Sequence, residues 1–171
     1  KTTGAGETLK SVTFEDNAAG AHSIKGNAID TLTLKDQALA LLTTITNTKS
    51  TALTVNLNNV TGASQVITGA GSKAETITIN SNGTKANTLI LTTTTAPVKT
   101  LNIAGDAEFT LGVGTPITIT DIVSTNSKGV TITDALDIDV KFTGGAGDDN
   151  VKLTGPFEKA INMGAGDDTV T

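Results

Sequence analysis

Short threonine-rich segments that alternate apolar and polar residues recur along the chain, and they constrain its fold more than any other feature. The clearest are ETLKSV from Glu7, DTLTL from Asp30, ETITI from Glu75, NTLIL from Asn87 and KTLNI from Lys99. A period of two is the signature of a strand with one buried face. Each segment is too short to bury that face alone, so we expect the segments to stack along an axis, as in solenoid proteins.

The composition favours the same architecture. About one residue in five is threonine, four phenylalanines are the only aromatic residues, and cysteine and arginine are absent. Threonine, valine, isoleucine, glycine and asparagine suit short strands joined by tight turns. We therefore predict an all-β fold, an irregular right-handed parallel β-solenoid of the β-helix or β-roll kind.

The spacing of the segments predicts one irregular domain. Thr76, Thr88 and Thr100 are each 12 residues apart, whereas earlier segments are 20 or more apart. We expect residues 1–171 to form a single solenoid segment of a larger protein, because the chain begins without methionine and ends within a repeat. Residues 36–42 are the least strand-like, and one or two turns of helix are an alternative there.

Charge and hydropathy argue against two kinds of partner. Twelve lysines and seventeen acidic residues give a net charge of −5, and no basic cluster occurs. The attraction that drives binding to a phosphate backbone is therefore missing, and we expect no nucleic-acid partner. The longest apolar run, residues 38–46, is too short and too rich in threonine to cross a bilayer, so no transmembrane segment is expected.

Two glycine-rich turns near the C-terminus contain the candidate metal-binding residues. Residues 144–152 read GGAGDDNVK, and residues 163–171 read MGAGDDTVT. The first copy matches the nine-residue pattern G-G-x-G-x-D-x-U-x at every fixed position, and in the second Met163 replaces the first glycine. The predicted metal ligands are the glycines and aspartates of both turns: Gly145, Gly147, Asp148, Asp149, Gly164, Gly166, Asp167 and Asp168.

Calcium is the cation that this pattern favours. Glycine lets main-chain carbonyl groups converge, and aspartate adds a hard anionic oxygen. A calcium ion takes six to eight oxygen ligands, more than one such turn supplies. Asp149 and Asp168 are 19 residues apart, close to one coil of two nine-residue halves, so the two turns are expected to stack and share an ion. The alternative is that Gly and Asp simply form tight, soluble turns.

On these residues the chain resembles the RTX calcium-binding repeats of secreted bacterial proteins, and the best RTX-like coil is residues 142–171. That family forms parallel β-rolls with calcium between successive glycine-aspartate turns. The threonine-rich remainder looks like surface-layer (S-layer) proteins and large adhesins of Gram-negative bacteria. The resemblance implies an extracellular location at the bacterial cell surface, type I secretion, and partners that are other copies of the protein or a cell-surface polysaccharide bound outside this segment.

Weaker copies of the turn are expected before several strands. The glycine elements at Gly4, Gly26 and Gly69 resemble the C-terminal turns, and Asp30, Glu75 and Asn87 occupy the aspartate position, but their loops lack the glycine pairs. A second possibility is that three aspartates complete a site with the Gly144 turn, although a solvated strand face is the simpler interpretation. These are Asp134, Asp137 and Asp139.

Three functional classes remain. The favoured one is a calcium-stabilised structural component of an extracellular surface layer. The second is the RTX tail of a secreted enzyme or adhesin; catalysis by this segment itself is not expected, because it has no Arg, Trp or Tyr and its single histidine, His22, has no partner for catalysis. The third is ice binding through outward T-x-T triplets such as Thr31 and Thr33, whose irregular spacing argues against a flat array.

Overall fold

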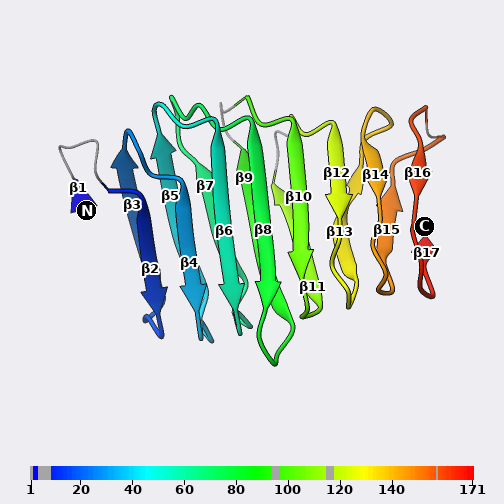
Figure 1. The fold of residues 1–171 in the computed structure, drawn as a ribbon, viewed down its shortest axis with the longest axis horizontal. Helices are drawn as coiled ribbons and strands as arrows, with labels where there is room; N and C mark the ends of the chain where they lie inside the picture. Colours follow the sequence, from blue (N-terminus) through cyan, green and yellow to red (C-terminus); the bar gives the residue numbers. More distant parts are fainter. Residues whose placement is uncertain (1, 4–8, 94–96, 115–117, 157) are drawn as a thin grey trace.

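The chain folds into a parallel β-solenoid in which it passes alternately between two facing sheets (Figure 1). This architecture is seen in a computed structural model that describes residues 2–3, 9–93, 97–114, 118–156 and 158–171. The described residues contain no helix, and so none that could cross a membrane. The predicted all-β solenoid is confirmed.

Odd-numbered strands form sheet A and even-numbered strands form sheet B, and every pairing is parallel. Sheet A contains β1 (Thr2–Thr3), β3 (Gly20–Gly26), β5 (Leu41–Asn47), β7 (Ser64–Thr68), β9 (Asn87–Thr93), β11 (Phe109–Gly114), β13 (Val130–Leu136), β15 (Asn150–Leu153) and β17 (Thr169–Val170). Sheet B contains β2 (Ser11–Glu15), β4 (Thr31–Lys35), β6 (Ala52–Asn58), β8 (Thr76–Asn82), β10 (Thr100–Gly105), β12 (Asp121–Ser124), β14 (Lys141–Thr143) and β16 (Ile161–Asn162).

Two rows of turns join the sheets. Turns that lead from sheet B to sheet A lie along the lower edge in Figure 1, here called the B-to-A edge. Turns that lead from sheet A to sheet B lie along the upper edge, the A-to-B edge. Any residue before an odd-numbered strand therefore lies on the opposite edge from a residue before an even-numbered strand.

The coils differ in length, as the irregular spacing predicts. Register partners are 25 residues apart at Ser64 and Leu89, but 19 apart at Asn150 and Thr169. The 12-residue interval that starts at Thr76 is half a coil, because Thr76 pairs directly with Thr100. The turns absorb the length differences, and the strands stay in register except for one shift between β13 and β15.

A single narrow core runs between the sheets. It is built from inward columns of Ile, Leu and Val, such as Leu53, Ile77, Leu101 and Ile122 on sheet B. Among the described residues, Phe109 and Phe142 are the largest fully buried side chains. The strands thus bury apolar residues on one face and place short polar residues on the other.

The T-x-T triplets do not form one array. Thr31 and Thr78 share an outward column of sheet B through Thr54, but Thr131 and Thr169 belong to strands of sheet A. On sheet B, asparagine continues the polar columns: the Asn80 amide donates to the Asn56 side-chain oxygen at 2.8 Å. The Asn56 amide in turn donates to the Thr33 hydroxyl at 3.4 Å, so polar side chains bond from coil to coil in this column of sheet B.

The helix considered for residues 36–42 is wrong. Asp36 adopts a positive φ of 52°, which starts a turn, and strand β5 begins at Leu41. The apolar residues Leu41 and Ile45 are buried and Leu42 faces outward with partial exposure, a period of two rather than the spacing of a helix. Pairing with β3 and β7 on both sides fixes the strand.

We predict that Phe142→Ala lowers the free energy of unfolding by about 3–5 kcal/mol, because it removes a fully buried aromatic side chain from a core that has little room to relax. Urea denaturation would measure the change. The neighbouring exposed residue provides the control: Lys141→Ala is expected to change stability by less than about 0.5 kcal/mol. Equal effects of the two substitutions would contradict the placement of Phe142 in the core.

Candidate metal-binding turns

The two glycine-aspartate turns stack directly on each other at the B-to-A edge. Residues 144–149 connect β14 to β15, and residues 163–168 connect β16 to β17. Asn150 pairs with Thr169 immediately after the turns. The 19-residue separation of the two motifs is therefore one coil of the solenoid.

Backbone hydrogen bonds hold the two turns together. The Ala165 N–H donates to the Gly145 carbonyl oxygen at 2.9 Å, and the Thr169 N–H donates to the Asp149 carbonyl oxygen at 2.9 Å. The parallel ladder of the sheet thus continues into the turns. Groups on one turn keep a fixed position relative to groups on the other.

Glycine is required where the turns touch. Gly164 has a φ of 88°, and a Cβ atom there would lie 2.1 Å from the carbonyl oxygen of Gly145. A side chain at this position would both strain the backbone and separate the two turns. The glycines of the motif therefore serve close stacking, with main-chain carbonyl groups brought to the contact.

Asp149 links three successive coils. Its side chain is 1% exposed. One carboxylate oxygen accepts the Val130 N–H of the preceding coil at 2.8 Å, and the other accepts the Gly145 N–H of its own turn at 3.0 Å. The Asp149 N–H in turn donates to the Asp168 carboxylate at 2.9 Å. Aspartate at this position thus repeats one hydrogen bond from coil to coil.

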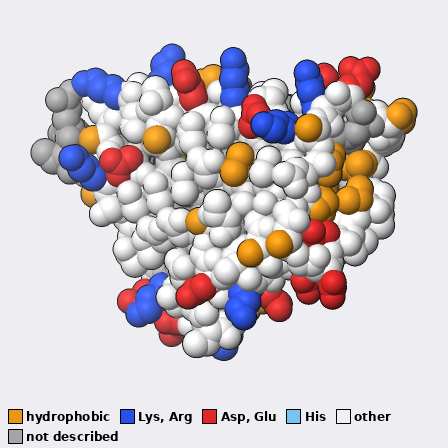
Figure 2. All heavy atoms as spheres, turned by 45° about the vertical axis from the view of Figure 1, so that its right-hand side comes forward, with side chains coloured by type: hydrophobic (Ala, Val, Ile, Leu, Met, Phe, Trp, Pro, Cys, Tyr) orange, Lys and Arg blue, Asp and Glu red, His pale blue; other side chains and the backbone are white. Residues whose placement is uncertain are grey.

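The other aspartates lie nearer the solvent. The Asp167 N–H donates to one Asp148 carboxylate oxygen at 2.8 Å, and both residues are exposed, while Asp168 is half-buried. Four carboxyl groups therefore gather within two adjacent turns. Figure 2 shows acidic side chains along this lower part of the molecule toward the C-terminal end.

The electrostatics of Asp149 reflect this crowding. Burial raises the pKa of the Asp149 carboxyl group, and the negative charges of Asp168 and Asp148 raise it further. The hydrogen bonds from Val130 and Gly145 act in the opposite direction, because they stabilise the ionised form. A cation at the turns would favour ionisation as well.

The donor groups suit a hard cation that accepts main-chain ligands. Within the described part of the chain, no group of three or more His, Cys, Asp and Glu side chains lies close enough to hold a metal ion by itself. A metal ion at these turns would therefore need main-chain carbonyl oxygens as additional ligands, a kind of ligand that calcium accepts. Both oxygens of Asp149 already accept N–H groups, so Asp148, Asp167 and Asp168 are the freer carboxylates.

A third turn, residues 125–129, belongs to the same stack although it lacks the glycine-aspartate motif. Asn126 is buried; its side-chain oxygen accepts the Lys128 and Gly129 N–H groups, and its amide donates to the Ala107 carbonyl oxygen at 2.9 Å. A Cβ atom at Gly129 would lie 2.1 Å from the Asp148 carbonyl oxygen. The sequence TNSKG lacks the glycine-aspartate pattern, although Asn126 lies 19 residues before Gly145.

Asn87 shares the strand position of Asp149. Asn87 is the register partner of Phe109, and Phe109 is the register partner of Val130. The Val130 N–H donates to the Asp149 carboxylate in the next coil. The buried Asn87 side-chain oxygen accepts the Val60 N–H at 2.6 Å. The predicted equivalence is therefore correct, and here a neutral amide makes the contact between coils.

Asp30 and Glu75 lie elsewhere. Each directly precedes a strand of sheet B, β4 or β8, and so belongs to the A-to-B edge. The predicted equivalence of the Gly26 and Gly69 elements with the C-terminal turns is therefore wrong. The glycine-aspartate turns lead into strands of sheet A, whereas the Gly26 and Gly69 elements lead into strands of sheet B. The Gly4 copy lies outside the described residues.

The aspartates before the Gly144 turn do not complete its site. Asp137 and Asp139 lie in the turn before β14, on the A-to-B edge. Asp134 lies where the register of β13 shifts, and its carboxylate accepts the Val113 N–H at 2.8 Å. The Asp134 side chain thus binds a backbone N–H of β11 just beyond Leu111, the last residue of β11 with a register partner in β13.

His22 packs within a strand of sheet A. It lies in β3, is partly buried and packs on Phe14 with ring centroids 4.6 Å apart. No catalytic arrangement was predicted for it.

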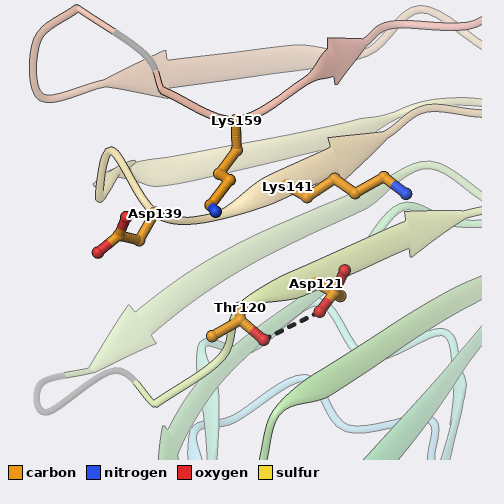
Figure 3. A pocket seen from close by; sticks show the side chains of 5 residues that line it. All are labelled: Thr120, Asp121, Asp139, Lys141 and Lys159. Carbon is orange, nitrogen blue, oxygen red and sulfur yellow. Dashed lines mark hydrogen bonds between the residues drawn. The ribbon is translucent and has the colours of Figure 1, made fainter.

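An open groove of about 450 Å³ lies near the A-to-B edge, away from the stacked turns. Figure 3 shows Lys159 reaching toward β12 and β14, and the Thr120 hydroxyl donates to Asp121 at 2.9 Å. The lining residues are Thr120, Asp121, Asp139, Lys141 and Lys159. Two lysines and two aspartates balance in charge, so the groove offers no net attraction to an ion.

Comparisons of the chain with protein-family models, with curated proteins and with solved structures found no match.

We predict that Asp149→Ala, measured in the presence of a chelator, destabilises the fold by about 2–5 kcal/mol. The substitution leaves the Val130 and Gly145 N–H groups without their acceptor, and a buried orphan donor costs about 1–3 kcal/mol. Chemical denaturation would measure the loss. Asp148→Ala is the matched control, since that exposed side chain accepts the Asp167 N–H; it should cost less than about 1 kcal/mol. Equal losses would show that Asp149 does not join the coils.

Proposed function

We propose that this chain is a calcium-stabilised β-solenoid segment of a bacterial extracellular surface layer, a structural protein rather than an enzyme. The observation that carries the proposal is the stacking of two glycine-aspartate turns in register on one edge of a solenoid. The resemblance of those turns to RTX repeats is the reason for proposing calcium as the cation, the cell surface as the location and type I secretion as the export route.

The proposed ligands come from both turns. Carboxylates of Asp148, Asp149, Asp167 and Asp168 would bind together with main-chain oxygens of Gly145, Gly147, Gly164 and Gly166. Bound calcium supplies positive charge that neutralises the carboxylates and ties one coil to the next. The chain's own contribution is to hold the turns in register through the Gly145 and Asp149 carbonyl groups.

The distribution of charge supports a role for a cation at this edge. Nine acidic residues and three lysines lie in or beside the turns of the B-to-A edge. The acidic residues are Glu15, Asp16, Asp36, Asp106, Glu108, Asp148, Asp149, Asp167 and Asp168, and the lysines are Lys35, Lys85 and Lys128. Among the described turns of this edge, only the two C-terminal ones bring four carboxyl groups into two adjacent coils. Their mutual repulsion makes this the part of the fold that gains most from a divalent cation.

Such a site would couple folding to export. Calcium that binds only the folded form stabilises it in proportion to the free concentration. A medium with millimolar calcium would complete the C-terminal coils after secretion, while the low calcium of a cytosol would leave them weaker. Other copies of the protein are the proposed partners in the layer, and surface polysaccharide would be bound outside residues 1–171.

Thermal melting with calcium and with chelator tests the proposal. With calcium at about 100 times its Kd, the unfolding free energy should rise by about 2.7 kcal/mol, which corresponds to roughly 5–10 °C in Tm for a domain of this size. Circular dichroism would follow the loss of strand structure. The same Tm in millimolar calcium and in chelator would overturn the calcium site.

A matched pair of variants locates the effect. Asp148→Asn with Asp167→Asn removes two exposed charges from the stacked turns and should abolish most of the calcium response. Asp137→Asn with Asp139→Asn removes two charges from the opposite edge and should leave the response intact. A response that survives the first pair but not the second would place the cation elsewhere.

A further inference from the structure

We infer that Asn82 is a site of spontaneous deamidation, a modification that converts its side-chain amide to a carboxylate without an enzyme. Asn82 is the last residue of β8, and it is the only asparagine in the chain that is followed by glycine. The turn that begins at Gly83 projects farthest along the B-to-A edge in Figure 1. The inference does not depend on calcium and goes beyond the proposed function.

The reaction needs a backbone nitrogen that can reach the side chain of the preceding asparagine. The Gly83 nitrogen attacks Cγ of Asn82, and the side-chain nitrogen leaves as ammonia, taking up the proton that the Gly83 nitrogen loses. Water then opens the five-membered succinimide ring at either carbonyl group and returns a proton to the Gly83 nitrogen. The products are aspartate and isoaspartate at position 82; one water is consumed, one ammonia is released, and no oxidation or reduction takes place.

Glycine at position 83 leaves the approach to this nitrogen open. Gly83 adopts a φ of 114°, a conformation that residues with a side chain rarely adopt. A Cβ atom there would lie 2.6 Å from the Asn59 side-chain oxygen. The fold therefore requires glycine at the position where its small size also speeds ring formation.

The reacting groups are the least restrained part of the turn. The Asn82 side chain is partly exposed and points outward, since the buried Ser81 precedes it in β8. Within the described part of the chain, neither its amide group nor the Gly83 N–H makes a hydrogen bond. The next two N–H groups, those of Thr84 and Lys85, both donate to the Asn59 side-chain oxygen, at 2.9 and 3.2 Å.

Strand pairing also weakens at this residue. Asn82 pairs with Asn58 of β6 on one side, but on the other side the pairing with β10 ends at Ser81, the partner of Gly105. A residue held on one side only can rotate more easily into the geometry that closes the ring.

Two other asparagines precede a small residue, and the fold protects both. Asn80 precedes serine in the middle of β8, is paired on both sides, and donates its amide to Asn56 at 2.8 Å. Asn126 also precedes serine, but it is buried, its oxygen accepts two N–H groups and its amide donates to the Ala107 carbonyl oxygen. Both side chains are held by bonds that ring closure would have to break.

The modification changes the charge of the B-to-A edge. The new carboxylate lies beside a groove of about 370 Å³ whose lining includes Gly83, Lys85, Asp106 and Lys128. It adds a negative charge to an edge that already has more acidic residues than lysines. The core is remote from the change, so the protein should remain folded in both forms.

Peptide mapping of the full folded chain provides the direct test. The protein is kept at mildly alkaline pH, where the attacking nitrogen loses its proton more readily, and is digested with trypsin before and after this incubation. One tryptic peptide, residues 74–85, contains both Asn80 and Asn82, so fragmentation by mass spectrometry shows which amide has become an acid. We expect the change at Asn82, as a mixture of aspartate and isoaspartate, while Asn80 and Asn126 stay amides.

Three results would overturn the inference. They are an unchanged Asn82, an equal extent of change at Asn80 and Asn82, and a product at position 82 that contains no isoaspartate, which would mean direct hydrolysis without the ring.

Unfolding the chain tests whether structure selects the site. In guanidinium chloride the bonds of Asn80 and Asn126 are lost, so both should be deamidated alongside Asn82. If Asn80 and Asn126 stay amides in the unfolded chain as well, the fold does not protect them, and the structural part of the inference is wrong.

Two variants complete the test. Asn82→Gln should lose the modified form, because its longer side chain would have to close a less favourable six-membered ring. Asn82→Asp reproduces the charge of the product and should keep the Tm of the unmodified chain, since the residue lies on the surface at a strand end. Acid formation at position 82 in Asn82→Gln at the rate of the unmodified chain, or a large fall in Tm in Asn82→Asp, would contradict the inference.

Discussion

Pairing between successive coils is the interaction on which the rest of the structure depends. A coil contributes one short strand to each sheet and a few apolar side chains, which is too little to form a core by itself. Strand pairing aligns these side chains into columns such as Leu53, Ile77 and Leu101, and only the columns exclude water. Coil length is free to vary between 25 and 19 residues because the turns, which lie outside the columns, absorb the difference. Strand register is therefore maintained along the axis, apart from the shift between β13 and β15, although the sequence spacing of the strands varies.

The need to bond each coil to the next also decides which turn residues stabilise the fold. Where a strand of sheet A begins, a backbone N–H of the preceding coil needs an acceptor, and Asn87 and Asp149 both provide one from a buried side chain. The amide does this without charge. The carboxylate does it with a charge that burial opposes and neighbouring aspartates oppose further. Aspartate in two consecutive coils is thus the costlier way to make the same contact, and a bound cation would offset that cost.

Strand periodicity predicted the all-β solenoid, because alternation at Thr76 to Ile79 or Thr88 to Leu91 is a local property of the chain. The stacking of the two glycine-aspartate turns was also predictable, since both the motif and its 19-residue spacing are visible in the sequence. Local sequence patterns do not show to which edge of the solenoid a turn belongs. Asp30 and Asp168 both precede a Thr-apolar-Thr triplet, yet they lie at opposite edges because one strand is in sheet B and the other in sheet A. The edge is decided by whether the strand that follows the turn is odd- or even-numbered along the chain, and that number depends on every earlier strand and turn.

Asn126 shows that a turn can join the stack without the sequence motif that predicts stacking. Its turn stacks against Gly145 and Gly147 as closely as the second motif does, yet it shares no motif residue except a glycine. Stacking demands a compact backbone and an internal acceptor, and an asparagine that binds two N–H groups meets that demand as well as GGAGDD does. The aspartate pairs at 148–149 and 167–168 therefore add something that stacking alone does not require. Charge that is not needed for the fold, placed where two coils meet, is the strongest argument from this chain that the turns serve a cation.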